Sequence, residues 1–75
     1  MKELAHYLVK QLADHPDKVD VRQTEHGDSL VLRVTVSEED KGKVIGKQGK
    51  VIKAIRAVVS AAAAKAGKRA ALDLE

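Results

Sequence analysis

The first residues of the chain alternate between apolar and polar side chains with the period of an α-helix. The pattern stops at Asp14-His15-Pro16-Asp17, which is a sequence typical of a turn. We therefore predict an amphipathic helix over residues 2–14, followed by a turn. The apolar positions of this helix are Leu4, Ala5, Leu8, Val9 and Leu12.

After this turn, apolar and polar residues alternate with a period of two, which indicates β-strands. Val19 and Val21 alternate with polar residues, and the stretch from Leu30 to Val36 has an apolar side chain at every even position. Between the two stretches, Glu25-His26-Gly27-Asp28 supplies the residue types that turns require. The pattern predicts a β-hairpin whose second strand buries its even-numbered side.

Ser37 and the three acidic residues after it predict a helix over residues 38–45, because acidic side chains are stabilised by the positive end of the helix dipole. Gly46-Lys47-Gln48-Gly49 interrupts this helix. Helical spacing of apolar residues resumes near Lys50 and continues through an alanine run to Gly67, which suits a C-terminal cap. The longest helix of the chain is predicted there.

The end of the chain, from Arg69 to Leu74, has a weak alternation that predicts a last strand. The predicted order of elements is therefore α-β-β-α-α-β. A chain of 75 residues is long enough for one small domain, which we expect to extend over residues 1–75.

Composition removes several classes of protein. The chain has no cysteine, so it forms neither a disulfide framework nor a thiolate metal site, and we expect it to fold in the reducing cytoplasm. No stretch approaches the roughly 20 apolar residues that span a bilayer. The N-terminus also lacks the apolar run and cleavage site of a secretory signal, so we expect neither secretion nor membrane insertion.

Charge is distributed unevenly along the chain. The 14 lysines and arginines and 11 acidic residues give a net charge of +3. Residues 1–40 hold five basic and nine acidic side chains, a balance of −4, whereas residues 41–75 hold nine basic and two acidic, a balance of +7. No acidic residue stands between Lys41 and Arg69. Such a stretch attracts a polyanion, although a solvated surface without a partner can carry the same charges.

Two glycines three positions apart, Gly46 and Gly49, lie within this basic stretch. Glycine has no Cβ, so a Gly-x-x-Gly turn lets a phosphate backbone come close to the main chain and tolerates positive φ angles. The helix that starts near Lys50 directs its free N–H groups and positive dipole end toward the turn, which suits an anion. We expect the loop to be exposed, so that a bulkier residue at either glycine impairs binding more than folding.

This segment resembles the signature of the KH domain, V-I-G-x-x-G-x-x-I-x-x-I. Every position of the motif is filled, and the surrounding α-β-β and α-β elements resemble the type II arrangement of that fold over the whole chain. On this basis the chain is identified as a member of the small bacterial KH-domain protein A (KhpA) family. The matching residues are Val44, Ile45, Gly46, Gly49, Ile52 and Ile55.

The resemblance implies an α+β, type II KH-like domain in which three helices cover one face of a three-stranded mixed sheet. It also implies a groove between the two motif helices and the sheet, where the glycine loop clamps the backbone of about four unpaired nucleotides of RNA. Carried onto this chain, Gly46, Lys47, Gln48 and Gly49 hold the phosphates. The resemblance further implies apolar surface from Ile45 and Ile52, and nearby charges from Lys43, Lys50 and Lys53.

The resemblance also implies the role of an RNA chaperone or post-transcriptional regulator, without a cofactor. Its implied partners are single-stranded RNA and a second KH protein, either another copy of this chain or a larger KH-containing protein. The single aromatic residue, Tyr7, disfavours RNA-binding folds that stack bases on aromatic side chains. The alternative is a KH-fold module for protein interaction or dimerisation, in which RNA binding is weak or depends on the partner.

Other chemistries fit the sequence less well. A P-loop needs four residues between its glycines and a Ser or Thr after the lysine, whereas here three residues separate the glycines and Gln48 stands in the Ser/Thr position. The histidines His6, His15 and His26 lack the spacing of a metal site and are expected at the surface. No serine or cysteine nucleophile accompanies Asp14 and His15. We therefore expect neither catalysis nor a bound metal.

Overall fold

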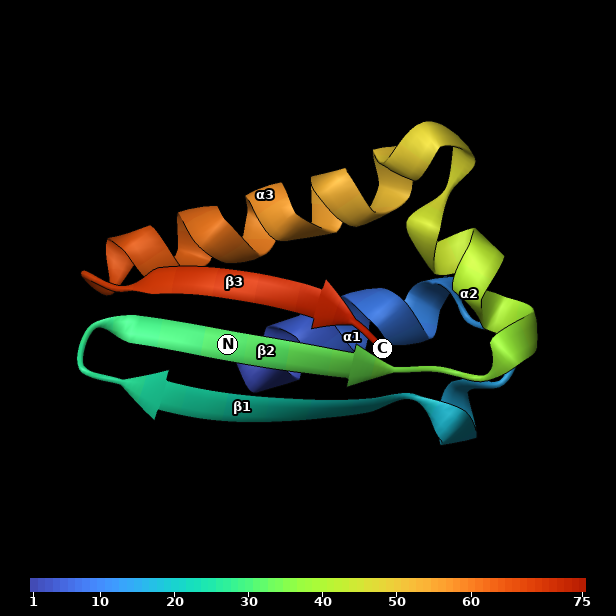
Figure 1. Cartoon of the computed structure of the whole chain (residues 1–75), viewed down its shortest axis with the longest axis horizontal. Coiled ribbons are helices and arrows are strands. Elements are labelled where there is room, and N and C mark those ends of the chain that lie inside the picture. Colours follow the sequence, from blue (N-terminus) through green and yellow to red (C-terminus); the bar gives the residue numbers. More distant parts are fainter.

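The computed structural model describes residues 1–75 as two layers, a three-stranded sheet and three helices on one of its faces (Figure 1). The helices are α1 (Lys2–Leu12), α2 (Glu38–Ile45) and α3 (Lys50–Lys65), and the strands are β1 (Asp20–His26), β2 (Ser29–Thr35) and β3 (Arg69–Leu74). Short 3-10 turns occupy Pro16–Lys18 and Lys47–Gly49. Figure 1 shows α1 crossing behind the strands and α3 running alongside β3. The order is the predicted α-β-β-α-α-β.

The sheet is mixed, as predicted, with β2 in the centre. β1 and β2 pair antiparallel and are joined by a two-residue turn at Gly27, whose φ of +59° suits glycine. β3 pairs with β2 in parallel, with Ser29 opposite Arg69. The free edge of β3 lies on the side away from β2, next to α3 (Figure 1).

The covered face of the sheet forms the core together with one side of each helix. On β2 the even-numbered residues Leu30, Leu32 and Val34 are buried, as predicted, whereas Arg33 is exposed. Removing such apolar surface from water contributes about 25 cal/mol per Å², which makes it the main force that holds the helices on the sheet. The other buried apolar residues are Ala5, Val9, Val19, Val21, Val36, Val44, Ile52, Ile55, Val59, Ala63 and Leu72.

α1 ends at Leu12, two residues before the end predicted from apolar spacing. Ala13 is already extended, and the N–H groups of Asp14 and His15 donate to the Asp40 carboxylate at 3.0 and 2.9 Å. These two N–H groups therefore bond to Asp40 on α2 and not to carbonyls of α1, so α1 does not continue. The spacing of apolar residues within α1 carries no information about that distant acceptor, so the predicted end was wrong.

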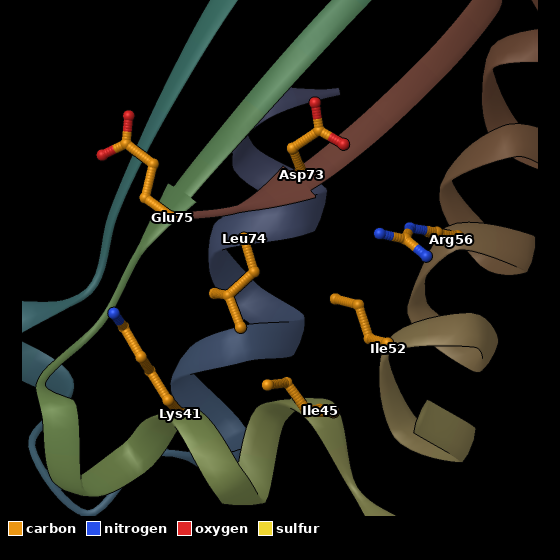
Figure 2. A pocket seen from close by; sticks show the side chains of 7 residues that line it. All are labelled: Lys41, Ile45, Ile52, Arg56, Asp73, Leu74 and Glu75. Carbon is orange, nitrogen blue, oxygen red and sulfur yellow. The ribbon is translucent and has the colours of Figure 1, made fainter. Parts of the chain in front are cut away.

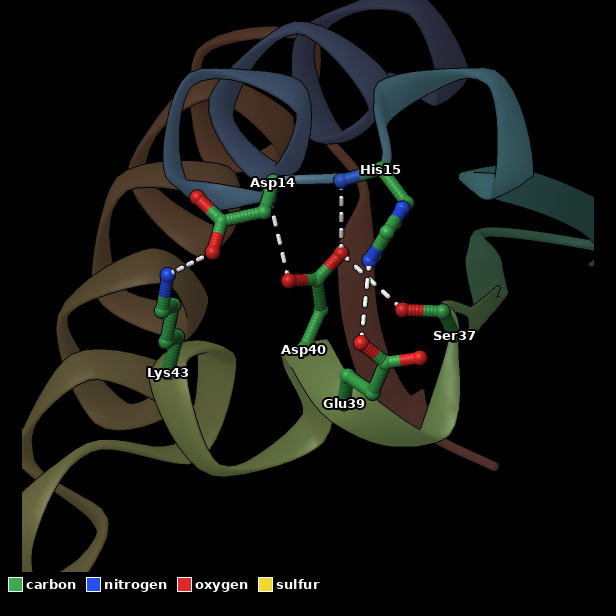
Figure 3. Close-up of polar contacts among 6 residues, drawn as sticks. All are labelled: Asp14, His15, Ser37, Glu39, Asp40 and Lys43. Atoms are coloured by element: carbon green, nitrogen blue, oxygen red, sulfur yellow. Dashed lines mark hydrogen bonds and ion pairs between the residues drawn. The ribbon is translucent and has the colours of Figure 1, made fainter.

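Asp40 is the buried charged residue of the chain and lies in the first turn of α2 (Figure 3). Ser37 occupies the N-cap position, as predicted, but its hydroxyl donates to the Asp40 carboxylate at 3.1 Å instead of accepting a hydrogen bond from a backbone N–H of the first turn. Burial raises the pKa of Asp40, and the hydrogen bonds from Asp14, His15 and Ser37 outweigh it, so that the pKa lies below its ordinary value of 3.8. The carboxylate is therefore ionised and fully paired.

The histidines lie apart from one another. His6 is half-buried on α1, where a ring nitrogen lies 3.2 Å from the Val19 carbonyl oxygen. His15 is half-buried beside α2, with its Nε2 3.3 Å from Glu39 Oε2, and His26 is exposed. All three histidines lie at the surface, as predicted, although the rings of His6 and His15 also contact neighbouring elements.

α3 ends in a Schellman motif, in agreement with the cap predicted at Gly67. Gly67 has a φ of +73° and donates its N–H to the Ala64 carbonyl at 3.0 Å, and the Lys68 N–H donates to the Ala63 carbonyl at 2.9 Å. This turn directs the chain into β3. None of the helices combines the length and the apolar run that crossing a membrane requires.

Replacing Asp40 by asparagine tests the junction between α1 and α2. The amide would place N–H donors against the donors of Asp14 and His15, so we expect the melting temperature at pH 7 to fall by about 5–10 °C. Thermal unfolding followed by circular dichroism measures this change.

The pH dependence gives a second readout of the same variant. Because the pKa of Asp40 is lowered in the folded state, its contribution is present above about pH 4 and is lost as the pH falls from there through the folded pKa. The Asp40→Asn variant should lose less melting temperature than the wild type between pH 5 and pH 2. The control is Asp28→Asn, which removes an exposed carboxylate of the hairpin turn. Parallel pH profiles for Asp40→Asn and the wild type would contradict this role.

Candidate nucleic-acid interface

A groove of about 490 Å³ lies between α2, α3 and the C-terminal end of the chain (Figure 2). The groove is where the KH resemblance implied it, between the two motif helices and the sheet. In the view of Figure 2, apolar side chains occupy its middle and charged side chains lie to either side. The lining residues are Lys41 and Ile45 from α2, Ile52 and Arg56 from α3, and Asp73, Leu74 and Glu75 at the end of β3.

The loop between α2 and α3 requires glycine at Gly46. This residue has φ +76° and ψ 171°, a region of the backbone map that is essentially closed to other residues. A Cβ there would overlap Cγ2 of Val51 and would lie 2.8 Å from the Val51 backbone nitrogen. α2 can therefore end directly against the first turn of α3 only because Gly46 has no side chain.

Gly49 meets a different constraint. Its φ is +75°, but a Cβ built there would approach nothing closer than Lys53 Cε at 3.8 Å. Both loop glycines are half-buried, so the expectation of an exposed loop holds for its two middle residues and only in part for the glycines. Lys47 and Gln48 are the exposed residues of the loop.

Gln48 is the single non-glycine residue of the chain with a positive φ, +57°. The left-handed conformation costs an ordinary residue about 1–2 kcal/mol. Strain of this kind persists where the surrounding structure holds the backbone, and it is frequent at binding sites. Two backbone hydrogen bonds hold the loop on either side of Gln48. The Gly46 N–H donates to the Gly42 carbonyl at 2.8 Å, and the Gly49 N–H donates to the Gly46 carbonyl at 3.1 Å.

Positive charge surrounds the loop. α3 begins at Lys50, directly after Gly49, so the positive end of its dipole lies at the loop. Lys47 and Lys50 are exposed, and the side chain of Lys53 passes beside Gly49. Three predicted lysines are thus brought together around the glycines.

Lys43 is placed differently from the other predicted lysines. Its ammonium pairs with the Asp14 carboxylate at the junction of α1 and α2, and this hydrogen bond raises the pKa of Lys43 (Figure 3). It does not line the groove. Lys43 therefore helps to hold α2 in place, and its charge is already partly neutralised by Asp14.

The floor of the groove is apolar. Ile45 is 41% exposed although it is a large apolar residue, and Leu74 is half-buried. Ile52 lines the groove but is buried, with 6% of its surface exposed. Ile45 and Ile52 are thus together in the groove, as the resemblance implied. Exposed apolar surface inside a concave site suits the faces of nucleobases or other flat apolar groups.

The free edge of β3 borders this floor. The N–H groups of Arg69 and Glu75 donate to carbonyls of the hairpin, at 2.8 and 2.9 Å. The backbone N–H and carbonyl groups of the odd-numbered residues of β3 therefore point toward β2. Even-numbered residues therefore present their backbone groups to the free edge. The Leu72 carbonyl accepts a hydrogen bond from Arg56 Nε at 2.9 Å. Leu74, the next residue of this set, presents its N–H and carbonyl beside the groove.

Five of the residues that line the groove were not predicted from the sequence. Lys41 and Arg56 stand one helical turn before Ile45 and after Ile52, so the helical period applied to these isoleucines would have identified both. Asp73, Leu74 and Glu75 had no such signal. Their place in the groove follows from the parallel pairing of β3 with β2, which local sequence does not specify.

Comparison with known proteins gives relatives along the whole chain. The profile of the family described as KhpA/KhpB, KH domain, matches residues 2–74. RNA-binding protein KhpA of Clostridium perfringens is 47% identical over 74 residues, which cover 99% of both chains. RNA-binding protein KhpA of Listeria monocytogenes is 45% identical over 74 residues, which cover 99% of this chain and 97% of the relative.

A solved structure has the same fold. It is the crystal structure of Era in complex with MgGDPNP and nucleotides 1506–1542 of 16S ribosomal RNA. The match has a TM-score of 0.61 at 23% identity and covers 97% of this chain but 28% of the Era chain. The fold agrees with the type II KH arrangement that the sequence predicted, and the family profile extends over nearly every residue, so this chain belongs to the KhpA/KhpB KH-domain family.

Proposed function

We propose that this protein binds single-stranded RNA in the groove between α2, α3 and β3, with the loop Gly46–Gly49 at the phosphate backbone. The observation that carries the proposal is the loop itself, in which a glycine without room for a side chain lies among exposed lysines at the start of a helix. The names of the relatives support it, since both are RNA-binding proteins. The Era structure supports it as well, because that protein was crystallised with ribosomal RNA.

Phosphates bind at the loop for three physical reasons. The N-terminal end of α3 offers a positive dipole, Lys47, Lys50 and Lys53 add full charges, and the glycines allow a phosphate to approach the backbone. The Coulomb term is independent of sequence and weakens with salt. It supplies affinity and orients the strand.

Bases then lie over the apolar floor. Ile45 and Leu74 offer exposed apolar surface, and the backbone of Leu74 offers a donor and an acceptor to a base edge. Bases of a duplex are stacked and paired, so their faces and edges are not available to such a floor, whereas an unpaired strand can present both. The groove therefore favours single-stranded over double-stranded RNA.

We propose further that the protein acts with a second KH protein, either another copy or a larger KH-containing chain, as an RNA chaperone or post-transcriptional regulator in the bacterial cytoplasm. One short groove binds few nucleotides, and a second groove on the same RNA raises the affinity through effective concentration. α3 offers a surface for such pairing, because Val58 is 48% exposed and its neighbours Ala57 and Ala61 are exposed too.

The double substitution Lys47→Asp/Gln48→Asp tests the loop. It places two carboxylates where phosphates should lie, so we expect binding of a labelled single-stranded RNA to weaken at least tenfold and the slope of log affinity against log salt to become shallower. Fluorescence anisotropy across a salt series measures both, after circular dichroism shows that the variant is folded.

The chain offers a matched control on α1. Lys10 and Gln11 are an exposed lysine-glutamine pair, and Lys10→Asp/Gln11→Asp changes the net charge by the same amount. This control should retain most of the affinity. Equal losses in the two double variants would show that RNA is held by diffuse charge and not by the loop, and the absence of micromolar binding by the wild type would refute RNA binding by this chain alone.

Alanine at each glycine separates folding from binding. Gly46→Ala forces a Cβ against Val51, so we expect it to lower the melting temperature and to abolish binding together, which corrects for Gly46 the expectation that a bulkier residue impairs binding more than folding. Gly49→Ala has room for its methyl group and only the positive φ to oppose it, so it should cost about 1–2 kcal/mol of stability and leave a folded protein with weakened binding. Thermal melts and anisotropy titrations on the same samples give both quantities.

Gly42→Ala is the control for these variants. Gly42 lies within α2, and a Cβ there meets nothing within 4 Å. Because alanine favours helix over glycine by about 1 kcal/mol, this variant should be more stable and should bind RNA normally. Equal destabilisation by Gly46→Ala and Gly49→Ala would contradict the distinct contacts assigned to the two glycines.

A further inference from the structure

Asp73 is an unpaired carboxylate in a groove that otherwise suits a polyanion. It is exposed near the end of β3 and lines the groove. Glu75, the other acidic lining residue, lies 3.6 Å from Arg33 Nη1 and accepts the Thr35 hydroxyl at 3.1 Å. Asp73 takes part in none of the ion pairs of the structure. Its charge therefore opposes a bound phosphate, unless the ligand gives it a hydrogen-bond donor.

Arg56 offers the complementary chemistry in the same groove. Its Nε donates to the Leu72 carbonyl at 2.9 Å, which fixes the guanidinium against the free edge of β3. A guanidinium has five N–H donors, so its two terminal nitrogens retain four, and no ion pair engages them. In Figure 2, Arg56 and Asp73 lie on one side of Leu74, and Lys41 and Glu75 lie on the other.

A donor and an acceptor at the border of an apolar floor can read the edge of a base. Cytosine presents an amino donor, N4, next to two acceptors, N3 and O2. Uracil presents a carbonyl oxygen, O4, where cytosine has the amino group, and that oxygen would face the carboxylate unfavourably. Arg56 can donate to the O2 of either base, so the carboxylate of Asp73 is the group that distinguishes them.

We propose that Asp73 and Arg56 form a base-selecting subsite that prefers cytosine to uracil. The proposal rests on the proposed function, because the base reaches this position only when the RNA strand lies in the groove. A competing explanation is that Asp73 only keeps the exposed edge of β3 from pairing with other strands, as charged residues at sheet edges often do. Base selectivity distinguishes the two explanations.

The test compares eight-nucleotide oligocytidine and oligouridine, both labelled and single-stranded, at one salt concentration and pH 7.5. We expect the wild type to bind oligocytidine roughly fivefold or more tightly, which is the low end for one good base contact. Asp73→Asn keeps the size of the side chain and removes the charge, so it should bring the ratio of the two affinities close to one. Asp28→Asn removes an equal charge outside the groove and should leave the ratio unchanged.

Each result decides between the explanations. Equal binding of the two oligonucleotides by the wild type, or an unchanged ratio in Asp73→Asn, would overturn the subsite while leaving RNA binding in place. Tighter binding of both oligonucleotides to Asp73→Asn by the same factor would show that the carboxylate only repels the backbone. If neither oligonucleotide binds to the wild type, RNA binding and the subsite fall together. Circular dichroism of Asp73→Asn shows whether the exposed substitution leaves the fold intact.

Discussion

The position of α2 decides where the groove lies, and the buried carboxylate of Asp40 holds α2 in position. It joins the start of this helix to the segment that follows α1 through two backbone amides, and the Ser37 hydroxyl at the N-cap of α2 donates a third hydrogen bond to it. A buried charge is tolerated only when hydrogen bonds replace the water it has lost, so this geometry has little freedom. Lys43 and Asp14 add a second link on the next turn of α2. Because its start is fixed, α2 places Lys41 and Ile45 in the groove and ends at Gly46.

The second constraint is steric and acts at the other end of α2. Gly46 lets the helix stop against Val51, which determines how closely α3 follows α2. The width of the groove therefore depends on both ends of α2, on the hydrogen bonds of Asp40 at its start and on the close packing of Gly46 against Val51 at its end. Within it, the apolar surface of Ile45 and Leu74 gives no preference among bases, and the loop gives none either. In the proposed function, the groups that can distinguish one base from another are therefore the charged side chains at the two sides of the groove and the backbone N–H and carbonyl of Leu74.

Local sequence predicted nearly all of the elements and the glycine loop. The third strand was predicted over 69–74 as observed, and the cap at Gly67 and the even-numbered core of β2 were also found, because each depends on neighbours a few residues away. The features that were missed depend on distant partners. Asp40 accepts hydrogen bonds from the two backbone amides that follow α1, Asp14 pairs with Lys43, and the parallel pairing of β3 brings Asp73 and Glu75 to the groove. Helical spacing alone would have revealed Lys41 and Arg56.

The strand order also links ligand binding to the completion of the fold. The hairpin of β1 and β2 closes over a two-residue turn, whereas β3 reaches β2 only after α2, the loop and α3 have been traversed. Closing such a long connection costs more chain entropy and is slow compared with forming a hairpin. Leu74 and Glu75 form one wall of the groove, so a chain whose third strand is unpaired has no groove at all. A ligand held there binds only the fully paired chain, and its binding energy adds directly to the free energy that keeps β3 in the sheet.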